Sequence, residues 1–282
     1  MHDRLFFFPV KFSLSTNWCN RTLETGEEIA DKAISLGFDE LELGFHTTAS
    51  QVEGFRRRLG EIPVGSVHAF CPVPLSAPQG YPELYQLASF DEETRKMAHL
   101  QITRNIRFAA DIGADCLVLH LGRVMCRGLF RRFDMKRRVK RGAKMVDVAK
   151  RELDALVPEL EKCKVVLGLE NLPYLEGFPA EWEVEALCGE WVRPWFDTGH
   201  DFVRIANGWK SVAAPAPVGL HVNDSLGDDD HLAPGAGKVD FESLKSLAEG
   251  ARHVVFEPNQ SVGEGELRAA LEFLRRKWGC EQ

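Results

Sequence analysis

The chain has 282 residues, of which 44% are hydrophobic, and its formal net charge is −7 at pH 7. This length and apolar content suffice to bury a full core, in two ordinary domains or in one large barrel. No run approaches the roughly 20 apolar residues that cross a bilayer, and the apolar stretch Leu5–Val10 is too short for a signal peptide. We therefore expect a soluble chain without a membrane partner.

Cysteine spacing and charge set two further expectations. The seven cysteines form no Cys-x-x-Cys pair, which predicts reduced thiols and favours a cytoplasmic location. The acidic balance argues against a surface that coats nucleic acid. One stretch, 123–144, nevertheless holds ten Lys or Arg residues and a single acid, Asp134. Two interpretations of this stretch stay open: it contacts phosphate groups, or it is simply a solvated helix face and a loop.

Short apolar runs alternate along the chain with longer segments of helical period, the pattern of parallel strands joined by helices. Two helices are well marked, one from a capping box at Ser89 and Glu92 to Gly113, the other from about Lys136 to Glu161. Eight such strands close more naturally into a barrel than into an open sheet. The predicted strands are Lys11–Ser15, Glu40–Phe45, Val64–His68, Cys116–His120, Val165–Glu170, Val192–Asp197, Gly219–Asn223 and His253–Glu257.

The predicted fold class is therefore α/β, a (β/α)₈ TIM barrel. No linker of low complexity divides the chain, so we expect one domain over residues 1–282.

Six predicted strands end in a side chain that can bind a metal. They end at His68, His120, Glu170, Asp197, His221 and Glu257. One such residue would more often be a cap, but six at equivalent positions are hard to explain in that way. The carboxyl ends of barrel strands meet on one face, where active sites form.

The acids among these residues would repel one another at such a meeting point, a cost that a divalent cation removes. The sequence therefore predicts a metal site built from Glu170, Asp197, His221 and Glu257. Carboxylate and imidazole ligands suit one Mn²⁺, Mg²⁺, Co²⁺ or Zn²⁺ ion. Loops beyond the strands add His200 and a segment that contains His231, Gly235 and Gly237. These glycines permit a tight backbone near a ligand, or belong to an ordinary loop.

These residues stand in stretches that resemble the sugar phosphate isomerase/epimerase superfamily, the xylose isomerase-like TIM barrels that also include the endonuclease IV-like proteins. The stretches are ISLGFDELELGFH, SVHAF, AADIGADCLVLHLG, VVLGLENLP, FDTGHDF, LHVNDS, DHLAPGAGKVDF and VVFEP. Together they cover nearly the whole chain. The resemblance implies a single-metal site at Glu170, Asp197, His221 and Glu257. The residues that we expect around a substrate are His68, His120, Asn171, His200, His231 and Arg123.

The expected reaction moves a proton at a carbon next to a carbonyl. A metal stabilises the enediolate that forms. Glu170 and Glu257 end the fifth and eighth strands, so they can face opposite sides of one carbon, where one removes and the other returns the proton. The predicted function is a divalent-metal-dependent isomerase or epimerase acting on a sugar, sugar phosphate or related polyol or keto acid. We expect a small-molecule carbohydrate as its partner, and a homo-oligomer is compatible with the fold.

Two alternatives stay open. An endonuclease IV-like nuclease for apurinic sites would bind three zinc ions, and the resemblance supplies all its ligand types, at His68, His120, Glu170, Asp197, His200, His221, Asp229, His231 and Glu257. Against it, that branch typically has Pro-Gly after the fourth-strand His and an LENTAG-like fifth strand, which this chain lacks. The other alternative is a barrel that binds a small molecule without turnover. Similar ketose epimerases often carry an Arg shortly after the seventh-strand His. Here SLGDDD follows, so Arg123 and Arg127 are the candidate cations.

Overall fold

The computed structural model describes residues 10–127, 134–205, 216–227 and 231–280. Within these residues, eight parallel strands form a closed barrel in the order β1-β10-β9-β8-β6-β4-β3-β2. The strands are β1 (Phe12–Ser15), β2 (Glu40–Leu43), β3 (Val64–His68), β4 (Cys116–Leu119), β6 (Val166–Glu170), β8 (Val192–Asp197), β9 (Gly219–Val222) and β10 (His253–Phe256). The predicted (β/α)₈ barrel is confirmed, and every predicted strand lies within two residues of its observed bounds.

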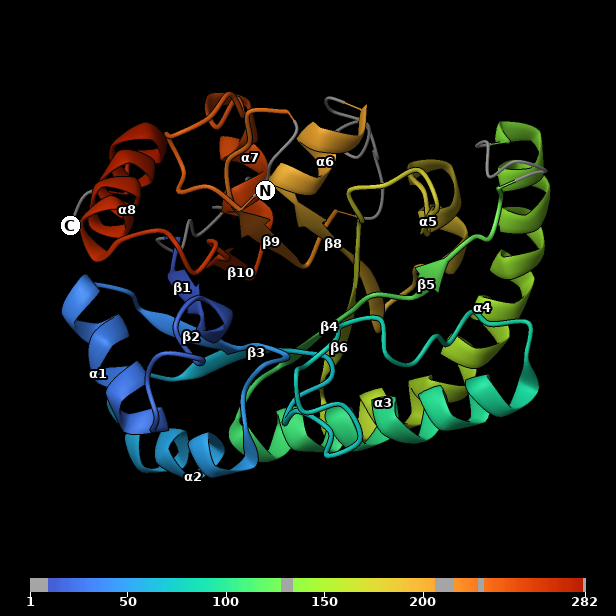
Figure 1. Cartoon of the computed structure of the whole chain (residues 1–282), viewed down its shortest axis with the longest axis horizontal. Helices are drawn as coiled ribbons and strands as arrows, with labels where there is room; N and C mark the ends of the chain where they lie inside the picture. The colour runs from blue at the N-terminus through green and yellow to red at the C-terminus, as the bar shows by residue number, and fades with distance from the viewer. Residues whose placement is uncertain (1–9, 128–133, 206–215, 228–230, 281–282) are drawn as a thin grey trace, which may run out of the picture.

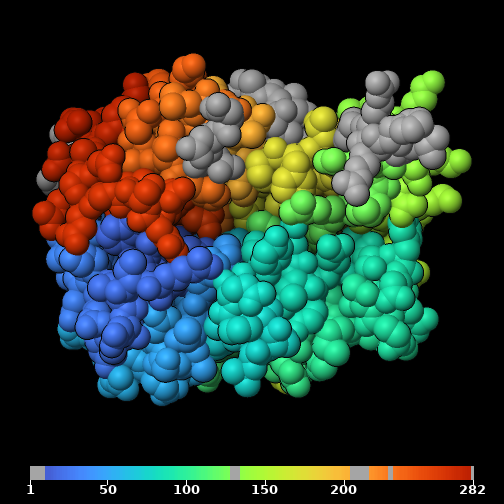
Figure 2. All heavy atoms as spheres, viewed as in Figure 1, coloured from blue at the N-terminus to red at the C-terminus, as the bar shows by residue number. Residues whose placement is uncertain are grey.

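The helices surround the barrel, which closes where its first strand, β1, pairs with its last, β10 (Figure 1). The helices are α1 (Gly26–Leu36), α2 (Ala49–Arg58), α3 (Glu92–Ile112), α4 (Met135–Cys163), α5 (Glu181–Leu187), α6 (Thr198–Ile205), α7 (Lys245–Gly250) and α8 (Glu264–Trp278), with short 3₁₀ helices η1 (Thr16–Trp18) and η4 (Glu242–Leu244). In the space-filling view, the first and last parts of the chain lie against each other on the surface (Figure 2). None of the described helices is long and apolar enough to cross a membrane.

The two helices marked in the sequence are present, with one correction. Helix α3 ends at Gly113 as predicted, and the left-handed φ of 89° there explains the glycine. Its N-cap, however, is Asp91, whose carboxylate accepts the Thr94 amide at 2.7 Å. Ser89 lies too far from the first turn and instead accepts the Asp91 amide at 3.1 Å. The predicted capping box at Ser89 and Glu92 is therefore wrong.

Trp195 fills the barrel interior beneath the predicted site. It is fully buried, and its indole centroid lies 5.1 Å from that of His221. Two glycines on neighbouring strands leave room for it: a Cβ at Gly168 would lie 2.9 Å from Trp195, and a Cβ at Gly219 would lie 2.2 Å away. These positions accept no larger residue while Trp195 stays in place. The close packing holds the indole in a fixed position beneath His221.

A two-stranded antiparallel sheet that the sequence did not predict links the loops after β4 and β6. It pairs β5 (Gly122–Arg123) with β7 (Gly177–Phe178). The fully buried Arg138 of α4 stabilises it, donating to the Glu183 carboxylate at 2.7 Å and to the Gly177 carbonyl at 2.7 Å. These contacts fix the loops that form one side of the barrel mouth.

A separate ionic cluster lies at the opposite end of the barrel, where the strands begin. His253 Nε2 is 2.7 Å from the Asp115 carboxylate, and His253 Nδ1 is 3.6 Å from that of Glu40. Lys11 pairs with Glu40 at 2.8 Å, and Arg252 lies 3.6 Å from Asp115. Burial lowers the pKa of His253, but the two carboxylates outweigh it and raise that pKa to about 9.

This cluster predicts that stability falls at alkaline pH. Because the folded pKa of about 9 exceeds the ordinary value of 6.5, the charged imidazole contributes fully below pH 6.5 and loses its contribution as the pH rises through 9. One pKa unit corresponds to about 1.4 kcal/mol. We expect the free energy of unfolding in urea to fall more steeply from pH 6.5 to 9 for the wild type than for His253→Gln. Parallel pH profiles for the two proteins would contradict the assignment.

Candidate metal centre and its cavity

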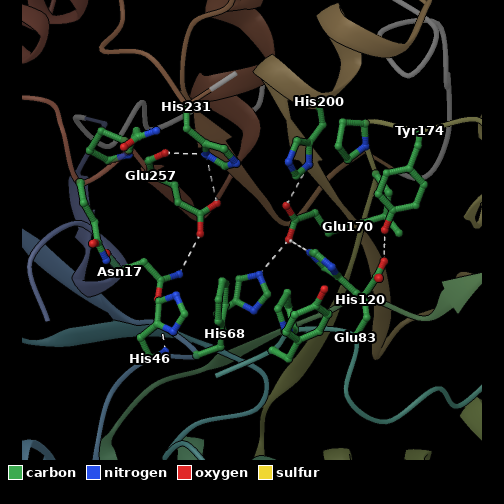
Figure 3. Close-up of a pocket in the computed structure, with 18 of the residues that line it drawn as sticks. Asn17, His46, His68, Glu83, His120, Glu170, Tyr174, His200, His231 and Glu257 are labelled. Atoms are coloured by element: carbon green, nitrogen blue, oxygen red, sulfur yellow. Dashed lines mark hydrogen bonds and ion pairs between the residues drawn. The ribbon is translucent and has the colours of Figure 1, made fainter. Parts of the chain in front are cut away.

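A cavity of about 460 Å³ opens at the carboxyl ends of the barrel strands (Figure 3). Most of the polar residues that the sequence predicted for the site line it, together with aromatic side chains that can cover the apolar face of a sugar. Its lining includes Asn17, Arg21, Phe45, His46, His68, Tyr81, Glu83, His120, Arg123, Glu170, Tyr174, His200, His231 and Glu257.

The four predicted metal ligands converge at the base of this cavity, which Glu170 and Glu257 line. One ligand atom from each of Glu170, Asp197, His221 and Glu257 lies within 4.8 Å of all the others, and all four residues are buried. His221 Nδ1 is 3.2 Å from Glu170 Oε1, 3.2 Å from Glu257 Oε2 and 3.8 Å from Asp197 Oδ2. Three carboxylates and one imidazole so placed fit a divalent cation. The structure thus brings the four together, and their role as ligands stays a prediction.

Asp197 is held rigidly by its neighbours. Its Oδ1 accepts the His200 amide at 2.7 Å, and its Oδ2 accepts Asn223 Nδ2 at 2.8 Å. Asn171 clamps the backbone, since its side chain donates to the Asp197 carbonyl and accepts the Asp197 amide. Burial raises the pKa of Asp197. The structure therefore does not place Asn171 at the cavity wall as a substrate contact; its amide joins the ends of β6 and β8.

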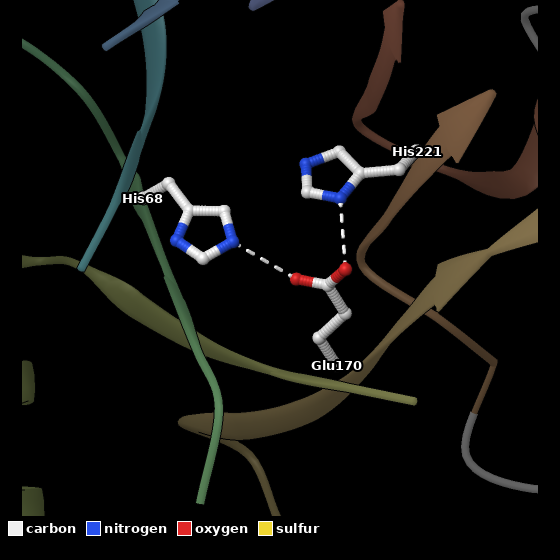
Figure 4. Close-up of side chains that lie close together, drawn as sticks. All are labelled: His68, Glu170 and His221. Carbon is white, nitrogen blue, oxygen red and sulfur yellow. Dashed lines mark hydrogen bonds and ion pairs between the residues drawn. The ribbon is translucent and has the colours of Figure 1, made fainter. Parts of the chain in front are cut away.

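Imidazoles surround the Glu170 carboxylate. His68 Nε2 lies 3.0 Å from Glu170 Oε2 (Figure 4), and His120 Nε2 lies at the same distance (Figure 3). His200 Nδ1 lies 3.4 Å from Oε1. Burial would raise the pKa of Glu170, but His221 and His120 outweigh it and hold that pKa well below its usual range. Burial lowers the pKa of His68, but its contact with the Glu170 carboxylate outweighs this effect and raises that pKa. Glu170 is therefore ionised at neutral pH.

Glu257 faces Glu170 from the other side of the floor (Figure 3). Asn17 Nδ2 donates to Glu257 Oε1 at 3.0 Å, and His231 Nδ1 lies 2.8 Å from the Glu257 carbonyl. His221 and His231 lower the pKa of Glu257 although burial opposes them. The sequence did not single out Asn17. The polar residues Thr16 and Asn17 directly after the first strand were the available signal.

Glu42 is a second residue that the sequence reasoning missed. It is fully buried on β2, and its carboxylate oxygens lie 3.1 and 3.2 Å from His221 Nε2. Ser66 Oγ also donates to it, at 2.9 Å. With Nε2 engaged by Glu42, Nδ1 of His221 faces Glu170 and Glu257. Burial lowers the pKa of His221, but Glu257, Glu42 and Glu170 outweigh it and hold that pKa well above its usual range.

The two arginines expected to supply a cation are both paired. Arg123 Nη2 is 2.5 Å from Glu83 Oε2, and the guanidinium lies 4.0 Å from the Tyr174 ring centroid. Tyr174 also hydrogen-bonds to Glu83. Arg127 pairs with Glu176 at 2.8 Å. Arg123 thus lies at the rim with its charge compensated, not at the floor.

Asp224 organises the loop that follows β9. Its carboxylate accepts the amides of Gly235, Gly237 and Val239 at 2.7 to 2.9 Å. A Cβ at Gly237 would lie 2.4 Å from Asp224 Oδ1, which explains that glycine. The loop therefore has a structural reason for its tight backbone and carries His231 to the cavity. Asp229, a ligand of the three-zinc alternative, lies outside the described residues.

The Xylose isomerase-like TIM barrel family model matches residues 30–277. The chain belongs to this family. Among solved structures similar to this xylose isomerase-like barrel, D-psicose 3-epimerase in the presence of D-fructose has a TM-score of 0.71 and 16% identity, over 95% of this chain and 99% of that one. The apo form of 3-keto-D-glucoside 4-epimerase from E. coli has a TM-score of 0.69 and 17% identity, over 95% and 99%.

A protein from Thermus thermophilus soaked with ZnCl₂ has a TM-score of 0.64 and 21% identity, over 98% of this chain and 100% of its own. At these identities the likeness shows the fold alone. No curated protein matches the sequence.

The contact between Glu42 and His221 predicts an effect on metal binding. Outer partners that orient a histidine ligand typically contribute 10- to 100-fold in metal affinity. We expect Glu42→Gln to weaken Mn²⁺ or Zn²⁺ binding by about that factor, measured by competition with a chromogenic chelator. Glu40→Gln is the matched control, because Glu40 lies on the same strand but contacts Lys11 and His253. Equal affinities for wild type and Glu42→Gln would sink the prediction.

Proposed function

We propose that this chain is a divalent-metal-dependent isomerase or epimerase of a sugar or sugar derivative. The observation that carries the proposal is the placement of Glu170 and Glu257, whose carboxylates face each other across the cavity floor and lie equally close to His221 Nδ1. Two ionised carboxylates on opposite sides of one space can act on opposite faces of one substrate carbon. The presence of sugar epimerases among the structural neighbours supports this choice of substrate class.

The proposed roles of the residues follow from their contacts. Glu170 and Glu257 are kept ionised by the surrounding imidazoles, so that either can take a proton from a carbon next to a carbonyl. The other carboxylate must then hold a proton of its own, which it delivers to the opposite face of the enediolate, and the choice of carbon decides between isomerisation and epimerisation. Asn17 fixes Glu257, and His68 and His120 fix Glu170, so that each base meets the carbon in one orientation.

The metal of this proposal would be held by Glu170, Asp197, His221 and Glu257. The donor set fits, because these ligand atoms already converge in a buried place where anionic oxygens otherwise repel one another. When bound, a divalent cation supplies Lewis-acid polarisation of the substrate's carbonyl and hydroxyl oxygens. His200 and His231 line the cavity beside this centre, where their rings can hydrogen-bond substrate hydroxyls.

Replacing either proposed base should stop proton transfer while leaving the fold intact. Gln keeps the volume of Glu but lacks the base, and loss of a general base typically lowers the rate by about 10²–10⁴. We expect losses of this size for Glu170→Gln and Glu257→Gln in the incorporation of deuterium from heavy water into ketoses, inososes and hydroxypyruvate. Near-native exchange rates in both variants would show that the two carboxylates do not carry the reaction.

Metal binding should raise the stability of the folded chain through His221. A metal that binds only the folded state at about 100 times its dissociation constant contributes roughly 2.7 kcal/mol, which raises the unfolding midpoint by several degrees. His221→Ala should lose most of this rise, measured against its own chelated midpoint because His221 is itself buried. His99→Ala, a change on α3, is the control and should retain it. An equal rise in His221→Ala would mean that the metal binds elsewhere.

One observation keeps the nuclease as a second candidate. His68 and His120 both point at Glu170, so the floor offers more imidazoles than one metal needs. Metal analysis of the purified protein separates the two functions: one ion per chain without cleavage of abasic DNA removes the nuclease, whereas three zinc ions with cleavage favour it. A barrel that binds without turnover would hold a ligand and show no deuterium exchange with any substrate.

A further inference from the structure

Arg21 stands at the cavity rim as a cation with no carboxylate partner among the described residues. It follows η1, and its side chain is exposed and lines the cavity. Its Nη2 donates to the Gln79 carbonyl at 3.0 Å and lies 3.2 Å from each ring nitrogen of His46. Neither Nε nor Nη1 of the guanidinium makes a hydrogen bond or ion pair with the described residues. The position of Arg21 is thus fixed while most of its donors are available.

The local packing fixes the site of this charge. Gly80 has a φ of +71°, and a Cβ there would lie 2.4 Å from His46 Nδ1, so the segment at Gln79 and Gly80 presses directly on the His46 ring. Burial and then the charge of Arg21 lower the pKa of His46 to about 4, which leaves the ring neutral at physiological pH. His46 therefore supports the guanidinium and adds no second charge.

The other arginine of the cavity is not available in the same way. Of the described residues that line the cavity, Arg21 and Arg123 alone carry a permanent positive charge. Arg123 is neutralised by the buried Glu83 and covered on one face by Tyr174. Glu83 already engages Nε and Nη2 of Arg123 and compensates its charge, whereas Arg21 has no carboxylate partner among the described residues.

Arg21 is also linked to the proposed reaction centre. The His46 amide donates to Asn17 Oδ1 at 3.4 Å, and Asn17 Nδ2 donates to Glu257 Oε1 at 3.0 Å. Arg21 and Glu257, one of the two proposed bases, thus lie on the same side of the cavity. His46 and Asn17 lie next to Glu257 on this side (Figure 3). A substrate whose reacting carbon lies between the two carboxylates can extend its far end along this side.

We propose that the substrate carries a terminal anionic group, a phosphate or a carboxylate, and that Arg21 binds it. This inference rests on the proposed isomerase or epimerase function and narrows its substrate class to acidic or phosphorylated ketoses. A guanidinium presents a planar fork of donors that matches either oxyanion. Around a floor rich in carboxylates, an anionic substrate needs such a cation at the mouth, and a neutral sugar does not.

The test compares matched substrates by deuterium exchange. The pairs are D-fructose with D-fructose 6-phosphate, D-ribulose with D-ribulose 5-phosphate, and D-fructose with D-fructuronate, in which C6 is a carboxylate. The wild type is expected to have the higher kcat/KM for one anionic class, and the pair that shows the preference identifies phosphate or carboxylate. Arg21→Gln should reduce the ratio of anionic to neutral kcat/KM by roughly tenfold to a hundredfold, as expected for a charge-assisted hydrogen bond.

Arg107→Gln is the control for net charge, because Arg107 lies on α3 and pairs with Glu159 at 2.7 Å. It should keep the wild-type ratio. A wild type that prefers the neutral sugar in every pair, or an Arg21→Gln variant that keeps the anionic preference, overturns the proposal.

If no ketose exchanges deuterium, the proposed function fails, and a binding measurement still decides the question of Arg21. Calorimetric titration of the same phosphates and carboxylates should then give tighter binding for the wild type and Arg107→Gln than for Arg21→Gln. Equal affinities in the three proteins, or no binding to any of them, overturn the anion site.

Discussion

The site depends on one electrostatic constraint: three buried carboxylates converge on Nδ1 of His221. Burying anions without compensation is costly, and the structure compensates them with imidazoles. His68 and His120 contact Glu170, while His221 itself lies between Glu170 and Glu257. Glu42 holds the other nitrogen of His221 and so directs Nδ1 at the acids. Every residue of this centre has its orientation fixed by a partner.

The surrounding barrel is built to keep this arrangement rigid. Trp195 packs beneath His221 in the space that Gly168 and Gly219 leave open. Asn171 and Asn223 secure the backbone and the carboxylate of Asp197. At the other end of the barrel, where the strands begin, the cluster around His253 pairs an imidazole with the carboxylates of Asp115 and Glu40. The division between a functional and a stabilising end is general for this fold.

The residues at the rim of the cavity and those at its floor differ in the roles that we propose for them. The floor provides acids that can move a proton, and that chemistry is common to isomerases and epimerases of many substrates. The loops after β1, β2, β3, β4 and β6 supply the residues at the rim of the cavity. They hold Arg21, His46, Glu83, Arg123 and Tyr174, and the pairing of Arg123 with Glu83 leaves Arg21 as the available cation. Under the proposed function, substrate choice would therefore depend on contacts between these loops rather than on the barrel.

The sequence by itself determined the barrel and which strand ends carry the acids and histidines of the floor. Strand periodicity and the position of a residue at a strand end are local features, and the carboxyl ends of parallel strands must meet on one face. The sequence also pointed to the tight loop that carries His231. Within helix α3 it fixed the end at Gly113 and misplaced the cap, because Ser89 and Asp91 are both good capping residues two positions apart.

Only the tertiary structure decided the partners across the barrel. Glu42 and His221 are 179 residues apart, and Asn17 and Glu257 are 240 apart, so their contacts exist only once the barrel closes. The same closure turned the Asn171 side chain toward the backbone of Asp197 and paired Arg123 with Glu83, contacts that the sequence did not predict. The type of a residue limits the interactions that its side chain can make. Which of these interactions forms depends on the buried polar groups that lie nearby and need a partner, and only the folded chain determines those neighbours.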